Sequence, residues 1–263
     1  SLSGITYGTN GFRLTFASAA ALGTDTSGQS NNFTPNNLST TDQTVDNPND
    51  NFINFGGAYR SHGTQQAAED GGFTIYASNG SGYTGAAATK EIPQSGKWYW
   101  EVKLTAVGSV QGITNPTYGV FDRNIKDEIN LFSTSNELQN QLGGMGATFY
   151  TGFRFTSLLG TSNELIIGSY TAATNDYVAF AFDMDNGKAW WGFKDDGGSD
   201  GNPATGANPT ITFNPKDHRF VPMQGFYAPG SGYSARYYYN FGQKAFDNAA
   251  PTGYSSLTTS NFS

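Results

Sequence analysis

Apolar side chains recur at every second position in several short segments of this chain. In residues 96–104, Trp98 and Trp100 fall on one face of an extended chain, while Tyr99 and Glu101 fall on the other. A period of two over about four to eight residues is typical of half-buried β-strands. The pattern predicts strands at residues 11–16, 72–77, 96–104, 117–121, 176–183, 188–193, 211–213, 220–223 and 235–241.

Residues 178–182, Val-Ala-Phe-Ala-Phe, are apolar at every position, which indicates a central strand covered on both faces. Asn186 and Gly187 follow this strand and predict a type I′ turn, after which the chain returns antiparallel. Helix-like spacing occurs only in residues 124–141, enough for about two turns. Residues 17–54 are rich in Thr, Asn, Asp and Gly and are predicted to form ordered loops, with disorder as the alternative.

The composition favours sheets over helices. Aromatic residues make up 15% of the 263 residues and charged residues 13%, whereas an average soluble domain has about 25% charged residues. Strands accept aromatic side chains and face solvent with Ser, Thr and Asn. We predict an all-β protein, an antiparallel two-sheet β-sandwich formed by residues 72–263, with residues 1–71 as a strand- and loop-rich N-terminal extension packed on it.

The net charge of −7 argues against binding to nucleic acid or to anionic membranes. No apolar run approaches the roughly 20 residues that span a bilayer, so we predict no membrane insertion. The absence of cysteine removes disulfides, thiolate metal sites and cysteine nucleophiles. Because the first residue is Ser rather than Met, we expect a processed product or a segment of a longer protein.

Three elements in order resemble a known domain. They are the strand Gly96-Lys97-Trp98-Tyr99-Trp100-Glu101, the strand and hairpin of residues 176–188, and the pair formed by Asn240-Phe241-Gly242-Gln243 and Pro251-Thr252-Gly253-Tyr254. In order and spacing they resemble the SPRY domain, a concanavalin-like jelly-roll sandwich. The resemblance implies binding rather than catalysis.

A second resemblance covers most of the chain. Several segments resemble those of bacteriophage tail-fibre and virion-surface proteins. They are Phe16-Ala17-Ser18, Leu22-Gly23-Thr24-Asp25-Thr26-Ser27-Gly28-Gln29-Ser30-Asn31-Asn32-Phe33-Thr34, Asp46-Asn47-Pro48-Asn49-Asp50-Asn51-Phe52, the hairpin from Asn186 to Gly192 and the loop of residues 201–209. This resemblance implies a location on the virion surface, other virion proteins as partners, a homo-oligomer (a trimer in a fibre) and host recognition. Residues 194–198 depart from the family pattern and residues 124–174 are longer than expected, so no binding surface is carried over from the family.

The chain contains several patterns that resemble enzyme motifs. Residues 80–85 match the glycine-rich dinucleotide pattern, but Pro93 leaves no room for the helix that it needs, so we interpret them as a turn. Residues 197–201 match a nucleophile elbow but lie in a loop-like composition. His62 and His218 are interpreted as surface or turn histidines. Glu101 has no partner carboxylate at glycosidase spacing and is expected to face solvent or a lysine. We predict no enzyme and no catalytic residues.

Acidic residues near the predicted hairpin raise the question of calcium. Asp183, Asp185 and Asn186, with three further aspartates in residues 195–200, offer oxygen ligands. Asp and Asn are equally suited to capping the backbone of a turn, which is the interpretation that we favour. We therefore predict no metal site and no cofactor.

Aromatic residues are the best candidates for contacting a ligand, because they combine a flat apolar face with a polar rim. We propose as contacts Trp191, placed on the face opposite Trp190, and the loop tyrosines Tyr83, Tyr118, Tyr227 and Tyr233. Their ligand would be a host-surface polysaccharide or a protein receptor. Two alternatives stay open: a purely architectural protein docked on other virion proteins, and a polysaccharide-degrading enzyme.

Overall fold

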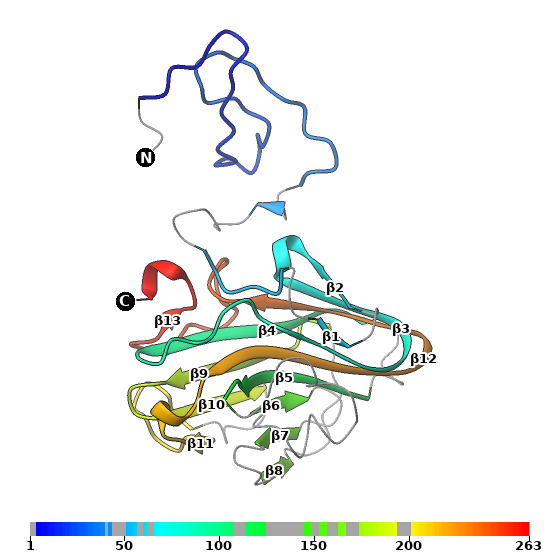
Figure 1. The fold of residues 1–263 in the computed structure, drawn as a ribbon, viewed down its shortest axis with the longest axis vertical. Coiled ribbons are helices and arrows are strands. Elements are labelled where there is room, and N and C mark those ends of the chain that lie inside the picture. The colour runs from blue at the N-terminus through cyan, green and yellow to red at the C-terminus, as the bar shows by residue number, and fades with distance from the viewer. Residues whose placement is uncertain are drawn as a thin grey trace. The chain divides into compact units, whose positions relative to one another are not determined.

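The structure is a computed structural model. It describes residues 4–39, 42–43, 51–56, 60–62, 66–107, 114–124, 145–148, 153–156, 163–166, 174–193 and 201–262. These belong to two compact units, residues 1–45 and residues 46–263. Regular structure in the described residues consists of β-strands and 3-10 helices three residues long (Figure 1). In that part of the chain, no helix has the length and apolar character needed to cross a membrane.

All thirteen strands of the described chain lie in the second unit. They are β1 (Arg60–His62), β2 (Gln66–Glu69), β3 (Thr74–Ala87), β4 (Lys97–Val107), β5 (Thr114–Asp122), β6 (Met145–Thr148), β7 (Phe153–Thr156), β8 (Asn163–Ile166), β9 (Tyr177–Asp183), β10 (Lys188–Phe193), β11 (Ile211–Thr212), β12 (Phe220–Asn240) and β13 (Ser255–Ser256). The 3-10 helices are η2 (Asp70–Gly72), η5 (Pro215–Asp217) and η6 (Thr259–Asn261).

The strands form two layers that share β3 and β12, and their pairing is antiparallel except where the short β13 pairs parallel with β4. In the first layer the order is β11-β10-β9-β4, followed by residues 235–240 of β12, residues 74–78 of β3, and β2. In the second layer the order is β8-β7-β6-β5, followed by residues 220–227 of β12, residues 80–87 of β3, and β1. The two long strands curve from one layer into the other (Figure 1). The predicted two-sheet β-sandwich is therefore confirmed.

Glycines lie where the long strands pass between the layers. The register between β12 and β3 shifts between Gly230 and Ser234, opposite residues 78–80 of β3. Glycine has no side chain to resist a sharp bend in a strand, which suits this position. Residues 80–85 are thus part of a continuous strand. Their interpretation as a turn was wrong, because β12 pairs with β3 on both sides of the bend.

Aromatic side chains from β4 and β9 form the centre of the core. Trp100 stacks on Phe180 with ring centroids 5.0 Å apart and contacts Phe182 at 5.2 Å. The register places Trp100 opposite Phe180 and Trp98 opposite Phe182, so these rings share the inward face. Tyr237 and Tyr239 of β12 lie in the same buried cluster.

Most predicted strands are present. Four of them correspond to β4, β5, β9 and β10; these were predicted at residues 96–104, 117–121, 176–183 and 188–193. The two strands predicted at 220–223 and 235–241 are parts of the single strand β12. The strand predicted at 72–77 begins β3, and the one at 211–213 corresponds to β11. The helix predicted at 124–141 lies outside the described residues except for Asn124, which is in a turn.

The hairpin between β9 and β10 differs from its prediction in detail. Asp183 pairs with Lys188, so the loop has four residues rather than two. Gly187 has a positive φ of 62°, but Asn186 does not, which excludes a type I′ turn. Asp183 accepts a hydrogen bond from the backbone N–H of Asn186 at 3.0 Å. A Cβ on Gly187 would lie 1.9 Å from the carbonyl oxygen of Phe213, so this close approach requires glycine.

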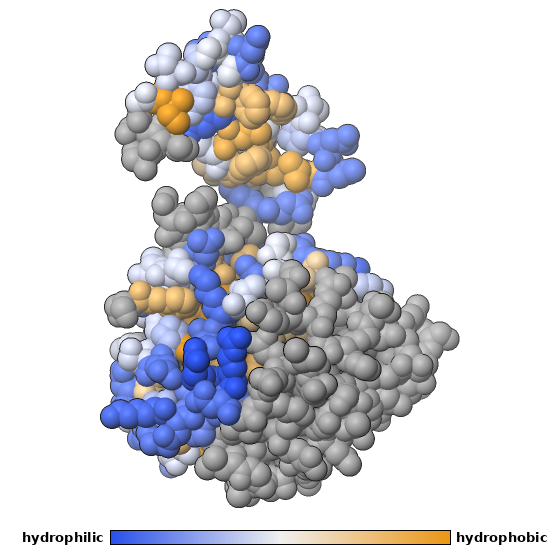
Figure 2. Space-filling model, viewed as in Figure 1, coloured by the Kyte–Doolittle hydropathy of each residue, from blue (hydrophilic) through white to orange (hydrophobic). Residues whose placement is uncertain are grey.

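The N-terminal unit is built from turns around one carboxylate. Asp25 accepts hydrogen bonds from the backbone N–H groups of Arg13, Ser27 and Asn31, each at 2.8 Å. Residues 11–16, predicted as a strand, form only an isolated bridge between Leu14 and Asp25. That prediction was wrong, because Phe16 has a φ of 51° and no neighbouring strand is present in the described part of the unit. Figure 2 shows hydrophobic residues gathered on the visible face of this unit.

The structural boundary falls between residues 45 and 46 rather than at 71. Phe52, Ile53 and Phe55 are buried in the sandwich core, and β1 and β2 pair with β3. Residues 46–71 therefore contribute to the second unit. Packing of residues 1–45 on the sandwich stays a prediction.

We expect Trp100→Ala to lower the free energy of unfolding by about 3–5 kcal/mol, because it removes the ring at the centre of the core. Trp100→Phe should cost clearly less. The phenyl ring keeps the stack on Phe180, and Trp100 Nε1 has no hydrogen-bond partner in the described structure. Urea denaturation followed by circular dichroism measures both. A larger loss for Trp100→Phe than for Trp100→Ala would contradict this account of the core.

Candidate functional site

A hollow lies on the outer face of the first layer, where small side chains separate large ones. Across three neighbouring strands, Ala181 lies between Tyr99 and Trp190. In the next row, Ala179 lies between Glu101 and Gly192. Two alanines and a glycine thus form the floor, and the hollow has a volume of about 210 Å³. The outward positions of β9 therefore create the space.

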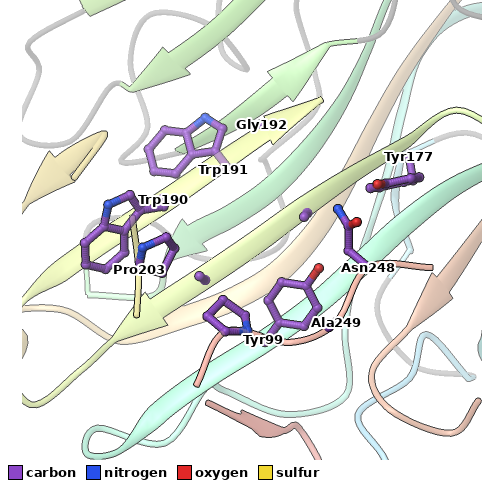
Figure 3. A pocket seen from close by; sticks show the side chains of 11 residues that line it. Tyr99, Tyr177, Trp190, Trp191, Gly192, Pro203, Asn248 and Ala249 are labelled. Atoms are coloured by element: carbon purple, nitrogen blue, oxygen red, sulfur yellow. The ribbon is translucent and has the colours of Figure 1, made fainter. Parts of the chain in front are cut away.

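The walls come from two segments far along the chain. One is the strap, defined as residues 244–254, which contributes Asn248, Ala249 and Pro251. The other is the loop of residues 201–209, which contributes Pro203. Figure 3 shows Pro203 near Trp190, and Asn248 with Ala249 near Tyr99. Tyr177 at the start of β9 completes the lining.

Glu101 holds the strap against the sheet. Its Oε1 accepts hydrogen bonds from Tyr99 Oη at 2.7 Å and from the backbone N–H of Asn248 at 2.8 Å. Its Oε2 accepts one from the backbone N–H of Asp247 at 2.8 Å. The expectation that Glu101 faces solvent or a lysine was wrong: the residue is 1% exposed, because the strap covers it.

The protonation of Glu101 is set by two opposing effects. Burial raises its pKa, while the donors from Asn248, Tyr99 and Asp247 lower it. Burial prevails, so the pKa lies above the ordinary value of 4.5. Burial and the neighbouring carboxylate also raise the pKa of Tyr99, which stays protonated and able to donate.

An aromatic contact and an ion pair add to the attachment of the strap. Phe246 packs edge-on against Tyr99 with ring centroids 4.9 Å apart. Lys103 Nζ lies 3.0 Å from Asp247 Oδ1. Because the lysine side chain is a quarter exposed and that of the aspartate nearly half, this pair contributes little to stability.

The loop of residues 201–209 is attached to the same face. Trp190 Nε1 donates to the carbonyl oxygen of Ala207 at 3.0 Å, and Lys188 Nζ donates to that of Gly206 at 2.9 Å. Tyr254 Oη donates to the carbonyl oxygen of Pro203 at 3.4 Å, which links the strap to the loop. The large side chains that wall the hollow are thereby held in place before any ligand arrives.

The lining of the hollow suits a neutral, amphipathic ligand. Its described lining contains aromatic rings, alanine methyl groups, prolines and the amide of Asn248, and it contains no charged side chain. Typical small-molecule sites enclose roughly 300–1,000 Å³. A hollow of about 210 Å³ is smaller and fits a single ring rather than an extended ligand.

The predicted contacts Trp191 and Tyr118 are not at the surface. Trp191 is 1% exposed and Tyr118 0%, and both lie in the core between the layers. Trp191 borders the hollow, but Figure 3 shows its ring pointing away from those of Trp190 and Tyr99. Their prediction as surface contacts was wrong, because Trp191 pairs with the inward-facing Phe180.

The tyrosines predicted in loops lie in strands instead. Tyr83 is in β3 and pairs with Tyr227 of β12, and Tyr233 lies further along β12. A role for them in binding stays a prediction.

Apart from Trp191, sequence reasoning missed the residues that line the hollow. The hairpin itself carried a signal for Trp190. Directly paired residues of an antiparallel hairpin share a face. Any hairpin loop with an even number of residues pairs Trp191 with a phenylalanine of β9, so Trp191 faces inward with that phenylalanine. That leaves Trp190 outward, beside Ala181. The strap residues carry no comparable signal, because their position depends on Glu101.

His218 and Asp122 form a buried pair elsewhere in the sandwich. His218 Nδ1 lies 2.6 Å from Asp122 Oδ2, and the histidine is 3% exposed. Its interpretation as a surface or turn residue was wrong, because its ring stacks on Phe220. Asp122 also accepts the backbone N–H groups of Arg219 and Asn124. These contacts tie the end of β5 to the start of β12.

The carboxylates considered above as possible calcium ligands make other contacts. Asp183 binds Lys97 at 3.0 Å and accepts from Asn186, and Asp185 accepts the backbone N–H of Gly96. Burial would raise the pKa of Asp183, but these hydrogen bonds hold it below its ordinary value. Within the described ranges, no three His, Asp or Glu side chains gather as a metal site would require. The aspartates of residues 195–200 lie outside those ranges.

Comparison with known proteins yields structural similarity only. No protein-family model and no curated protein matches the chain. The crystal structure of the SPRY domain of human HERC1 is 14% identical with a TM-score of 0.44, covering 66% of this chain and 91% of that one.

Two further solved structures are similar at the same level. The TRIM65 PSpry domain is 11% identical with a TM-score of 0.43, covering 68% of this chain and 86% of that one. The metal-free carbohydrate recognition domain of Emp46p is 7% identical with a TM-score of 0.44, covering 69% and 87%. At these scores the similarity adds nothing to the β-sandwich that the strand pairing itself defines.

We expect Glu101→Gln to lower the free energy of unfolding by about 1–3 kcal/mol. In either orientation the amide group of glutamine points at the backbone N–H of Asp247 or of Asn248, which then loses its acceptor. Lys103→Met, on the same face of β4, should cost less than about 1 kcal/mol because it removes only an exposed ion pair. Urea denaturation compares the two. Equal losses would contradict the role of Glu101.

The stability of the protein should also change with pH through Glu101. Because the folded protein raises the pKa of this carboxyl, the protonated form is favoured in the folded state. The associated stability is complete below about pH 4.5 and is lost as the pH rises through the raised pKa. The difference between wild type and Glu101→Gln, measured by denaturation from pH 4 to 8, should follow this trend. A difference that grew more favourable to the wild type with rising pH would have the wrong sign.

Proposed function

We propose that this protein is a non-enzymatic virion protein, a tail fibre or surface decoration, that holds one sugar ring of a host-surface polysaccharide in the hollow above Ala179 and Ala181. The hollow carries the proposal about the ligand. The virion part rests on the sequence resemblance of residues 16–34, 46–52, 186–192 and 201–209 to tail-fibre and virion-surface proteins.

A sugar ring matches the chemistry of this lining. One face of a pyranose carries C–H groups and packs on aromatic rings, while its edge carries hydroxyl groups that need hydrogen-bond partners. Tyr99, Tyr177 and Trp190 supply the aromatic surface, and the amide of Asn248 supplies both a donor and an acceptor. The uncharged lining favours a neutral sugar over an acidic one.

The arrangement of carboxylates supports binding over hydrolysis. A glycosidase needs two carboxyl groups, separated by about 5–5.5 Å for retention of configuration or about 6.5–9.5 Å for inversion. The described lining contains no acidic side chain. Glu101 lies beneath the strap with its oxygens taken up by three donors, so it is not free to attack or protonate a substrate.

We expect Ala179→Leu to weaken binding to purified host-surface glycans at least tenfold, because the added side chain fills the floor of the hollow. Ala245→Leu is the matched control, since Ala245 is exposed on the strap and does not line the hollow. Glycan arrays identify a ligand, and titration calorimetry measures its affinity for both variants.

Three outcomes decide between the functions. Unchanged affinity in Ala179→Leu would place the sugar site elsewhere. Binding to no surface glycan of a known host would overturn the sugar proposal and leave docking on other virion proteins. Release of free sugar on incubation with host capsule would overturn the non-enzymatic part.

A further inference from the structure

The strap middle, defined as residues 246–250, has its backbone hydrogen-bonded to the sheet through a single side chain. Asp247 and Asn248 donate their backbone N–H groups to the carboxylate of Glu101, each at 2.8 Å. No other backbone hydrogen bond of the strap middle is present in the described structure. The remaining contacts of this segment are one aromatic ring on the sheet and the exposed ion pair of Asp247. Its attachment therefore depends mainly on Glu101.

Both ends of the strap are held independently of Glu101. At the start, the side-chain amide of Asn240 donates to the carbonyl oxygen of Ala245 at 3.0 Å and accepts from the backbone N–H of Lys244 at 3.4 Å. At the end, the chain enters β13, which pairs with β4. The strap middle can therefore leave the sheet while the strap stays fixed at both ends.

The strap middle buries little surface. Asp247, Asn248 and Ala249 are exposed, while Phe246 and Ala250 are partly buried against the outer face of the first layer. Segments with few buried side chains and few backbone hydrogen bonds open at a lower free energy than the whole fold. Opening of the strap middle alone therefore costs less free energy than unfolding of the sandwich.

The same segment completes the hollow. Asn248 and Ala249 line it on the side of Tyr99, opposite the wall at Trp190 (Figure 3). When the strap middle leaves the sheet, this wall is lost, while the floor formed by β9 and the wall at Trp190 stay in place. A ligand that touches both walls is therefore held only while the strap lies against Glu101.

Glu101 is buried without a cation beside it. Titratable side chains on this outer face come from four elements: Tyr99 and Lys103 of β4, Tyr177 of β9, Tyr238 of β12, and Lys244 and Asp247 of the strap. Each lysine has another partner, since Lys103 pairs with Asp247 and Lys244 lies over the ring of Tyr238. The carboxyl of Glu101, 1% exposed, makes no ion pair in the described structure.

The protonation of Glu101 and the position of the strap are therefore linked. With the strap closed, burial raises the pKa of this carboxyl above 4.5, although three hydrogen-bond donors oppose the shift. With the strap open, the carboxyl meets water and its pKa returns to the ordinary value. The closed strap binds the proton more tightly, so its stability is complete below about pH 4.5 and is lost as the pH rises through the raised pKa.

We propose that the strap middle is a pH-dependent gate on the hollow, closed on Glu101 in acid and opening as the pH rises. The structure shows the closed state. The gate does not depend on the identity of the ligand, but its effect on sugar affinity rests on the proposed function. A sugar that contacts Asn248 favours the closed strap, so its binding takes up protons and weakens with rising pH.

Hydrogen exchange of the full chain tests the gate without any ligand. We expect the protection of the strap peptide, corrected for intrinsic exchange rates, to fall by up to about tenfold for each pH unit above the raised pKa of Glu101. The peptide of β9, residues 177–183, is the internal reference for unfolding of the whole sandwich. Its protection should change much less over the same pH range.

Two variants identify the titrating group. Glu101→Gln should lower the protection of the strap but make it independent of pH. Lys103→Met is the matched control, because it removes a charge from the same face of β4 and keeps Glu101, so the pH trend should persist. Tryptophan fluorescence verifies that both variants are folded. Strap protection that stays constant or rises with pH in the wild type, the same trend in Glu101→Gln, or an equal loss in β9 would overturn the proposal.

Calorimetry separates the gate from the proposed function. In buffers of different ionisation enthalpy, glycan binding to the wild type should take up protons at a pH where the strap loses protection, and binding to Glu101→Gln should take up none. Glycan binding without proton uptake would overturn the gate and leave the sugar site intact. Binding to no glycan would overturn the sugar proposal, and the exchange experiment alone then decides the gate.

Discussion

The packing of β9 against β4 determines both the core and the candidate site. Along β9, inward Phe180 and Phe182 meet Trp100 and Trp98, and this contact excludes water from the centre of the sandwich. The alternate positions, Ala179 and Ala181, point outward by the period of two. The seven residues of β9 thus place large side chains on the inward face and small ones on the outward face. A shift of register by one residue would exchange these faces and disrupt the core and the hollow together.

The site is completed by contacts distant in sequence. Glu101 is an outward residue of β4, yet the strap buries it, because its carboxylate accepts backbone N–H groups that would otherwise be unpaired on that segment. On the outer face of this layer, polar hydrogen bonds attach the strap, while the side chains that line the hollow are mainly apolar. That division lets the walls be rigid without placing a charge in the hollow.

The sequence allowed the sandwich to be predicted because alternation in β4 and the apolar run in β9 depend on local pattern alone. The position of the strap could not be predicted, because no pattern in residues 244–254 indicates that they bind Glu101. The strand predicted at residues 11–16 failed for a related reason. Phe12, Leu14 and Phe16 alternate correctly, but alternation yields a strand only where a second strand pairs with it, and Asp25 offers a single bridge.

The face of Trp191 illustrates a different error. Pairing within the hairpin would have placed it inward, opposite a phenylalanine, for either a two-residue or a four-residue loop. The information was therefore present, and treating aromatic residues singly rather than as cross-strand pairs concealed it. Tyr118 was misplaced in the same way, since it pairs with the buried Gln224 of β12.

The size of the hollow limits the affinity that its ligand can reach. A site of about 210 Å³ holds one ring, and a ligand of about a dozen non-hydrogen atoms gains only a few kcal/mol, which corresponds to millimolar affinity. Such a site becomes effective when several are presented together, because the second and later contacts are then intramolecular.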